Sequence, residues 1–285
     1  DAVGIFVWAK KVQTNSQPWA WGIDLDQNNN VYVTGQFAGT GDFDPGAGTF
    51  NMTSSYGAQI FVLKLEVAGE FVWAKNFITN GLSGGECVGK SIKIDPLGNI
   101  YTAGYFVDTV DFDPGVATFQ LVSNGDIDIF ISKLDASGNF VWAKSFGGNN
   151  RDEVYDLELD DVGNVYTTGG FQDSVDFDPN GSAFDLYSFG SEVFISKLDA
   201  SGNFVWAKHF AGGAGDYYGQ GIAVDADHNV FTTGYINSSV DMDPGPNSLY
   251  MGSGIGVIFV SKLNAAGDYV WAKILPTSGF GYGNG

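Results

Sequence analysis

Cysteine, histidine and positive charge are scarce in this sequence. It holds one cysteine, Cys87, and two histidines among 285 residues. A single cysteine excludes an intrachain disulfide, so the fold must be stabilised by packing or by a bound metal. No apolar run approaches the roughly 20 residues that a membrane-spanning helix needs. We therefore expect no insertion into a membrane.

The charge balance is strongly acidic, with 13 lysines and arginines against 33 aspartates and glutamates and a net charge of −20. Such a surface repels phosphate backbones, which argues against nucleic acid as a partner, and it attracts cations. Most lysines recur at fixed repeat positions, so no basic patch can be assembled from them. We expect these lysines to pair with repeat aspartates or to cover aromatic rings.

What the sequence does have is a repeat of 64 to 69 residues. Trp-Ala-Lys begins at five tryptophans, Trp8, Trp73, Trp142, Trp206 and Trp271. A glycine after an aromatic run, an Asp-x-Asp-Pro segment and a Lys-Leu pair recur at the same period and in the same order. Self-similarity of this kind indicates a repeat architecture.

The third repeat shows the strands of one unit in full. Residues 154–160 alternate apolar and polar side chains, 165–171 are rich in β-forming residues, and 193–198 and 204–208 flank a hairpin loop that contains Gly202. No helical period of useful length is present. Four antiparallel strands in a repeated unit predict a propeller blade, whose wide outer gap suits the large tryptophans as core residues.

We predict an all-β fold, a β-propeller of four-stranded antiparallel blades with four complete blades and partial flanking blades. The predicted boundaries are 1–11 for the fourth strand of a partial blade, 12–75, 76–144, 145–208 and 209–273 for the blades, and 274–285 for the start of the next. Because this set does not close neatly into a ring, we expect a piece of a longer protein and a six- to eight-bladed propeller.

Two segments of the third repeat carry a family resemblance. Residues 160–169 read Asp-x-x-Gly-Asn-Val-Tyr-x-Thr-Gly, and 194–202 read Phe-x-x-Lys-Leu-Asp-x-x-Gly. They resemble the bacterial SBBP-type β-propeller repeat family. Other repeats depart from the pattern, with Ala103 in place of Thr and His228 in place of the turn glycine. The resemblance implies a secreted or cell-surface location and no activity, and the acidic inserts are similar to those of Bacteroidota surface proteins exported by type IX secretion.

The acidic inserts supply the candidate metal ligands. Each contains an Asp-x-Asp pair: Asp42 and Asp44, Asp111 and Asp113, Asp176 and Asp178, and Asp241 and Asp243. All follow the second strand, which predicts acidic loops on one propeller face, shared with the loops between fourth and first strands. Alternate carboxylates could help to bind Ca²⁺, which takes 6–8 oxygen ligands. The other interpretation is a type II turn at Asp-Pro-Gly, with the aspartates capping local N–H groups.

Aromatic residues specific to single repeats are the candidate ligand-binding residues. Trp19 and Trp21 lie before a first strand, and Tyr217 and Tyr218 occupy the matching loop of the last full repeat. Exposed rings at loop positions could stack on sugar rings. Alternatively, they cover the gap to the next blade as half-buried caps.

Two short segments resemble the O-glycosylation sequence of Bacteroidota, in which Asp is followed by Ser or Thr and an apolar residue. They are 108–110, with Thr109 as the acceptor, and 173–175, with Ser174 as the acceptor. Both precede an Asp-x-Asp-Pro loop. We therefore predict glycosylation at these two hydroxyls.

Taken together, these features favour a non-enzymatic extracellular binding or adhesion module, with a protein or glycan at the cell surface as its partner. No Ser/His/Asp set, zinc motif or nucleotide-binding loop is present. The acidic residues mostly recur in every repeat, whereas catalysis needs one asymmetric site. A structural or spacer element of a large surface protein is the alternative. A glycoside hydrolase would require perturbed carboxylates in one repeat only.

Overall fold

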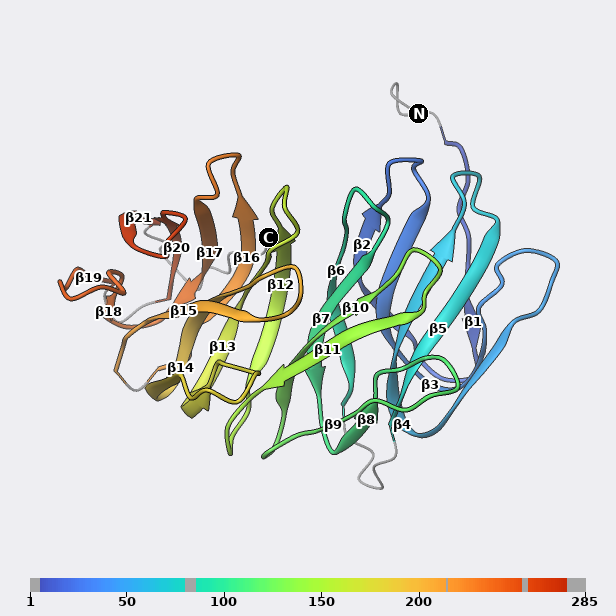
Figure 1. Ribbon diagram of the computed structural model, residues 1–285, viewed down its shortest axis with the longest axis horizontal. Helices are drawn as coiled ribbons and strands as arrows, with labels where there is room; N and C mark the ends of the chain where they lie inside the picture. The colour runs from blue at the N-terminus through green and yellow to red at the C-terminus, as the bar shows by residue number, and fades with distance from the viewer. Residues whose placement is uncertain (1–5, 80–85, 214, 253–255, 276–285) are drawn as a thin grey trace. The chain divides into compact units, whose positions relative to one another are not determined.

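The computed structural model describes residues 6–79, 86–213, 215–252 and 256–275, and every regular element among them is a β-strand (Figure 1). The chain forms two compact units. The first comprises Asp1–Thr102, Asp108–Val122 and Lys133–Val141, and the second comprises Ala103–Val107, Ser123–Ser132 and Trp142–Gly285. The outermost parts of the predicted flanking blades, 1–5 and 276–285, lie outside the described residues.

The described strands form one seven-stranded sheet, three four-stranded sheets and one two-stranded sheet, and the seven-stranded sheet contains a set of four long antiparallel strands like those of the four-stranded sheets. The first sheet contains β2 (Trp19–Leu25), β3 (Val31–Asp42), β4 (Asn51–Leu65) and β5 (Phe71–Thr79). The second contains β6 (Val88–Ile94), β7 (Ile100–Phe106), β10 (Asp128–Leu134) and β11 (Phe140–Phe146). The third contains β12 (Glu153–Leu159), β13 (Val165–Asp176), β14 (Asp185–Leu198) and β15 (Phe204–Phe210). The fourth contains β16 (Tyr218–Val224), β17 (Val230–Ile236), β20 (Val257–Leu263) and β21 (Tyr269–Leu275).

Five short strands complete the description. Strand β1 (Gln13–Thr14) pairs with the end of β3, β8 (Thr109–Asp111) pairs with β5 and with β9 (Gln120–Val122), and β18 (Val240–Asp241) pairs with β19 (Tyr250–Met251). Residues 6–11, predicted as a fourth strand, are in no strand. The fold is an all-β propeller fold of four-stranded blades, as the repeat predicts, and blade boundaries and total blade number stay predictions.

The turn between the first and second strand of each sheet is built around one aspartate. In the third sheet Asp160 Oδ1 accepts the backbone N–H of Val162 (3.2 Å) and Asn164 (2.8 Å). Its Oδ2 accepts the Asn164 amide (2.7 Å) and the Tyr166 hydroxyl (3.1 Å). The same Asp–Asn pair closes the turns at Asp26, Asp95 and Asp225. The Asp-x-x-Gly-Asn-x-Tyr pattern is therefore explained as a turn structure.

A close approach between the first two strands explains the glycine that recurs on the second strand. A Cβ on Gly169 would lie 1.9 Å from the carbonyl oxygen of Glu153, and one on Gly234 would lie 1.9 Å from that of Tyr218. Next to each contact the first strand changes register, between Val154 and Asp156 and between Gly219 and Gly221. Only glycine fits opposite such a bulge.

The recurring tryptophans pack between sheets, as predicted. Trp142 donates its indole N–H to the carbonyl of Ala200 (3.4 Å), and Trp206 donates to that of Ala265 (3.3 Å), in the hairpin of the following sheet. Trp8 makes the same bond to Val67 (3.0 Å). The buried cluster around Phe210 and Phe259 likewise joins side chains of the third and fourth sheets. The third and fourth sheets thus share one apolar core.

The lysines of the Lys-Leu pairs cover aromatic rings, which confirms one of the two predicted roles. The ammonium groups lie 4.7–4.9 Å from ring centroids in four equivalent pairs: Lys64 over Tyr32, Lys133 over Tyr101, Lys197 over Tyr166 and Lys262 over Phe231. These are cation–π distances. The lysines therefore belong to the structure of the sheets.

Candidate functional site

A polar groove with a volume of about 520 Å³ lies within the second unit. It is lined by residues 150, 172–173, 188–191 and 215–216. These come from β13, from β14 and from the two loops that precede β12 and β16. A volume of this size is typical of small-molecule sites.

A β-bulge directs Asp173 to the groove. The pairing of β13 with β14 changes register between Gln172 and Ser174, and Asp173 adopts a positive φ of 63°. A bulge of this kind bends the strand and re-aims side chains. The Asp173 carboxylate accepts a hydrogen bond from the Asn150 amide (3.4 Å). Exposed carboxylate and amide groups therefore stand side by side on one wall.

The opposite wall is held by backbone contacts. Ser191 N–H donates to the carbonyl of Gly215 (3.0 Å), and Tyr217 N–H donates to the carbonyl of Ser191 (3.0 Å). The two bonds tie the loop that carries Asp216 to β14, where Ser191 and Asp216 form a parallel bridge. The Asp216 carboxylate is exposed. This wall is therefore preformed and supplies a second acidic acceptor.

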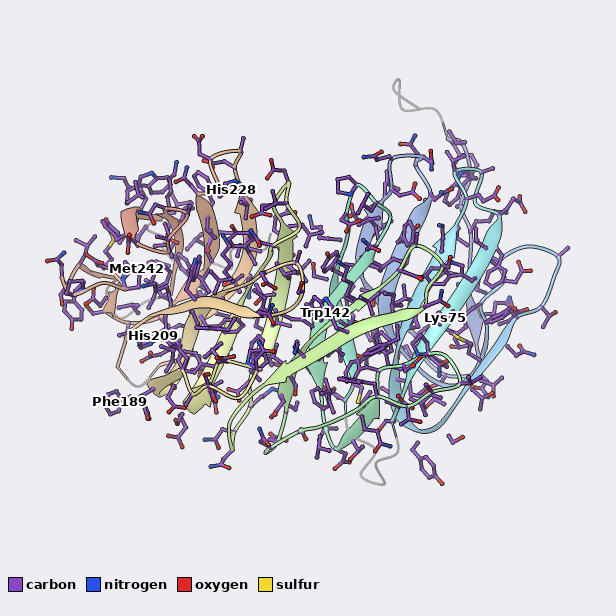
Figure 2. The ribbon with its side chains drawn as sticks, viewed as in Figure 1. Lys75, Trp142, Phe189, His209, His228 and Met242 are labelled. Carbon is purple, nitrogen blue, oxygen red and sulfur yellow. The ribbon has the colours of Figure 1, made fainter. Side chains whose placement is uncertain are left out.

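Phe189 is the apolar element of the groove. Its side chain is 89% exposed, and Figure 2 shows it projecting away from the ribbon. Along β14 the exposed positions are Asp185, Tyr187 and Phe189, while Leu186 and Ser188 between them are half-buried. A half-buried strand normally turns its polar residues outward. On β14 the outward positions instead include the aromatic residues Tyr187 and Phe189, whose exposure packing within the sheet does not require.

Two fully buried carboxyl groups lie behind the groove. Asp152 accepts the N–H of Gln172 (2.9 Å) and of Gly148 (2.7 Å), and Asp128 accepts that of Asn124 (3.0 Å). Burial raises the pKa of Asp128 to about 6. Burial, reinforced by the charges of Asp128 and Asp173, raises the pKa of Asp152 to about 7.

The pKa values of these two carboxyl groups are raised, but the groups belong to different repeats, Asp128 to 76–144 and Asp152 to 145–208, whereas a hydrolase would require such a pair in one repeat. Both side chains are 0% exposed, and Asp152 uses both oxygens to accept backbone N–H groups. A general acid or base must come within hydrogen-bond reach of a substrate. Asp152 holds Gln172 of the groove wall through its backbone N–H, and we assign neither buried carboxyl group a catalytic role.

The eight aspartates of the acidic inserts hold their own loops together. In each insert Oδ1 of the first aspartate accepts two backbone N–H groups, for example those of Asp113 (3.1 Å) and Phe119 (2.8 Å) at Asp111. The second aspartate accepts one, as Asp113 does from Gly115 (2.8 Å). The equivalent bonds occur at Asp42 and Asp44, Asp176 and Asp178, and Asp241 and Asp243. The capping interpretation fits these bonds, and calcium binding stays a prediction.

The expected shared face is visible within the second unit. Ala211, in the loop before β16, accepts the N–H of Asp241 at the start of an acidic insert (2.7 Å). Gly212 forms a bridge with Val240. The loop between a fourth and a first strand therefore does lie beside an acidic insert.

The four predicted aromatic ligand residues have different environments. Trp19 and Trp21 lie in β2 itself, not before it, and are 47% and 49% exposed with their rings stacked at 5.9 Å. Tyr217 is 0% exposed, so the expectation of an exposed ring was wrong there. Tyr218 is half-buried, with its ring edge-on to Tyr155. Tyr217 is buried because its loop is folded onto β14, whereas Tyr218 is the first residue of β16 and not part of the predicted loop.

The predicted glycosylation segments have a backbone role. Asp108 and Asp173, the aspartates that precede Thr109 and Ser174, adopt positive φ angles of 61° and 63°. Gly39 occupies the equivalent position of the first repeat, with a φ of 69°. Asp is among the few residues that tolerate this region. Thr109 is half-buried and Ser174 exposed, and their glycosylation stays a prediction.

Comparison with known proteins agrees with this architecture. Residues 205–240 match the family model described as SBBP, a beta-propeller repeat. The chain is similar to an uncharacterized WD repeat-containing protein, L264, of Acanthamoeba polyphaga mimivirus, with 24% identity over 322 aligned residues. That alignment covers 94% of this chain and 23% of the viral protein. Among the described residues there is no helix that could cross a membrane. The chain is a β-propeller repeat protein.

Proposed function

We propose that this chain is a non-enzymatic extracellular binding module and that the groove of the second unit binds a neutral glycan at a cell surface. The observation that carries the proposal is the 89% exposed Phe189 beside the carboxylates of Asp173 and Asp216. The extracellular location rests on the resemblance to secreted propeller repeats.

The chemistry of the groove suits a sugar. Carboxylates accept strong, charge-assisted hydrogen bonds from hydroxyl groups, and the amides of Asn150 and Gln172 can both donate and accept. An exposed phenyl ring offers an apolar face for the C–H side of a pyranose. The net charge of −20 repels sulfated or sialylated chains. A neutral oligosaccharide therefore matches the groove better than an acidic one.

A glycan array probed with the whole chain, with and without Ca²⁺, tests the proposal. We expect binding to neutral oligosaccharides, and we expect Phe189→Ala to weaken it at least about tenfold because a stacked ring contributes on the order of 1–2 kcal/mol. Asp216→Asn should weaken binding to a similar extent. Both side chains are exposed, so neither change should alter the melting temperature by more than about 2 °C.

Tyr250→Ala is the matched control, since Tyr250 is 67% exposed on β19 and does not line the groove. Equal binding by the wild-type chain, Phe189→Ala and Tyr250→Ala would disprove the assignment of the groove. Binding lost on Trp19→Ala but not on Phe189→Ala would move the site to β2.

The alternative is a structural or spacer element, and the interlocking of sheets favours it. The tryptophans, lysines and aspartates of the repeat all serve packing or turns. A spacer would bind no glycan, and substitutions at Phe189, Asp173 and Asp216 together would leave assembly into the surface layer unchanged. Loss of surface assembly in that triple variant would count against it.

A further inference from the structure

His228 departs from the residue type that its turn requires. The four turns between first and second strands place Asn29, Gly98, Gly163 and His228 at positive φ, between 59° and 83°. Glycine and asparagine adopt this conformation readily. The turn itself therefore needs no imidazole, and the other three turns close without one.

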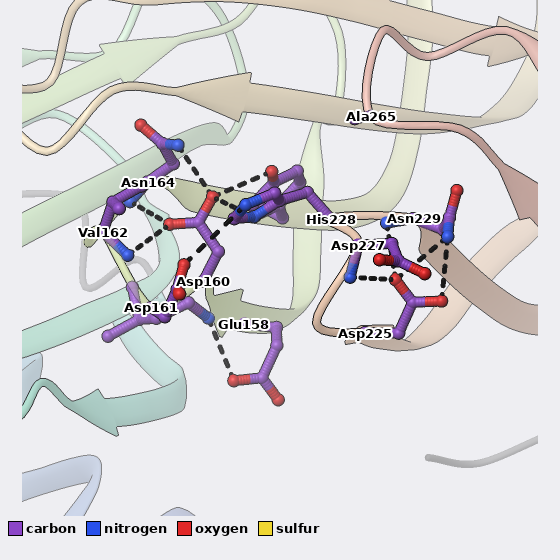
Figure 3. A network of polar contacts seen from close by, with 12 residues as sticks. Glu158, Asp160, Asp161, Val162, Asn164, Asp225, Asp227, His228, Asn229 and Ala265 are labelled. Carbon is purple, nitrogen blue, oxygen red and sulfur yellow. Dashed lines mark hydrogen bonds and ion pairs between the residues drawn. The ribbon is translucent and has the colours of Figure 1, made fainter.

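The imidazole reaches the equivalent turn of the third sheet, within the same compact unit. Its Nδ1 lies 3.2 Å from Asp160 Oδ2, and its Nε2 lies 3.8 Å from Asp161 Oδ1 (Figure 3). One ligand atom from each of these three residues can be chosen so that all lie within 4.8 Å of one another. Asp160 is held rigidly, with its side chain 1% exposed, whereas the Asp161 side chain is 79% exposed and free to rotate.

The contact is not a complete hydrogen bond. The Nδ1 atom of His228 is buried and has no hydrogen-bond partner. The facing oxygen, Asp160 Oδ2, already accepts from Asn164 and Tyr166. A buried nitrogen without a partner is costly, and such atoms in a folded protein call for an explanation.

We propose that His228, Asp160 and Asp161 form a binding site for a divalent transition-metal ion such as Zn²⁺. Imidazole nitrogen and carboxylate oxygen are zinc ligands at about 2.0–2.2 Å, and two such ligands of a tetrahedral ion stand about 3.3 Å apart. The 3.2 Å between Nδ1 and Asp160 Oδ2 matches that edge. Rotation of the exposed Asp161 side chain brings the third ligand, and water completes the shell.

The surroundings of the three ligands favour a cation. Asp225 and Asp227 belong to the same turn as His228 and add negative potential, which the Lys262 ammonium offsets only at Asp225 (3.4 Å). A nitrogen ligand distinguishes this site from the calcium site predicted at the acidic inserts, because Ca²⁺ takes oxygen ligands. A bound ion would join the turns of two sheets at their ends.

Calorimetric titration with zinc chloride, together with imidazole proton spectra, tests the site. We expect about one equivalent to bind the wild-type chain and to shift the ring signals of one of the two histidines. His228→Asn keeps the turn, since Asn29 already occupies that position, and should weaken binding at least about tenfold. Asp161→Asn should weaken it as well, while Asp227→Asn and a His209→Asn variant should bind as the wild-type chain does.

Two results would overturn the proposal. One is equal zinc affinity of the wild-type chain and His228→Asn. The other is zinc binding that leaves the His228 ring signals unmoved, which would mean that the three residues form an ion pair alone. Calcium chloride in place of zinc chloride should show no dependence on His228, and a dependence of equal size would also contradict a transition-metal site.

Discussion

Burial raises the pKa of the Asp152 carboxyl group, and the charge of Asp128 adds to this rise, although Asp128 begins β10 and Asp152 lies in the loop before β12. Their pKa values of about 6 and about 7 exceed the value of about 3.9 for an unfolded aspartate. The folded state therefore binds more protons than the unfolded state between about pH 4 and pH 7. The contribution of this pair to the free energy of unfolding is greatest below about pH 4, and it is lost as the pH rises through 6 and 7.

We therefore predict that the free energy of unfolding falls by on the order of 4 kcal/mol between pH 5 and pH 8, measured by urea denaturation. Asp128→Asn removes the charge, and its amide oxygen can still accept the N–H of Asn124. This variant should be more stable than the wild-type chain at pH 8 and should show a flatter pH profile. If the variant is less stable than the wild-type chain at both pH values, ionisation of Asp128 is not the cause of the lower stability at pH 8.

The hairpin glycine Gly202 allows a neighbouring sheet to pack. A Cβ at this position would lie 3.2 Å from the Trp142 ring, and its φ is 79°. We predict that Gly202→Ala costs about 2–3 kcal/mol, from backbone strain and from displacement of the tryptophan. Gly181 has a φ of 90° but no atom within 4 Å of a Cβ, so Gly181→Ala should cost only the strain, about 1 kcal/mol. Thermal and urea unfolding of the two variants measure the difference, and equal losses would contradict the packing role.

The first aspartate of each acidic insert should matter more to stability than the second. Asp111 accepts two backbone N–H groups and Asp113 accepts one. We expect Asp111→Ala to cost about 1–3 kcal/mol and Asp113→Ala about half as much, measured by urea unfolding. A larger loss of stability for Asp113→Ala than for Asp111→Ala would show that the number of capped N–H groups does not determine the cost.

Calcium binding at these inserts has a separate readout. If the pairs ligate Ca²⁺ through their remaining oxygens, millimolar Ca²⁺ should raise the melting temperature relative to a chelator, because an ion that binds only the folded state stabilises it. Asp44→Asn and Asp113→Asn should reduce the rise. The same melting temperature in chelator and in Ca²⁺ would contradict calcium binding at the inserts.

The sheets could be predicted from the sequence because their signals are local and occur four times. The turn from Asp160 to Asn164, the hairpin at Gly202 and the strands between them are each determined by residues a few positions apart. Repetition then distinguishes the signal from chance. The tryptophans were also predictable, since a large apolar residue at every repeat needs a common packing site.

The candidate site was harder to predict from the sequence because it depends on contacts between repeats. Nothing local shows that Tyr217 is buried, since that follows from its loop pairing with Ser191. The Asp128 and Asp152 pair and the His228 cluster likewise join residues of different repeats. Phe189 could have been found, because aromatics at alternate positions of β14 contradict an outward polar face.

Equivalent positions in the first and fourth sheets offer a direct measure of packing between blades. Ile23 and Ile222 occupy the same register of β2 and β16, two residues before the strand end. Ile222 is 7% exposed and belongs to the core shared with the third sheet, whereas Ile23 is 69% exposed. The same substitution should therefore have different costs at the two sites. We predict that Ile222→Ala lowers the free energy of unfolding by about 2–4 kcal/mol and Ile23→Ala by less than about 0.5 kcal/mol, both measured by urea unfolding. A cost of similar size at Ile23 would contradict its exposure and would mean that another surface covers β2 in solution.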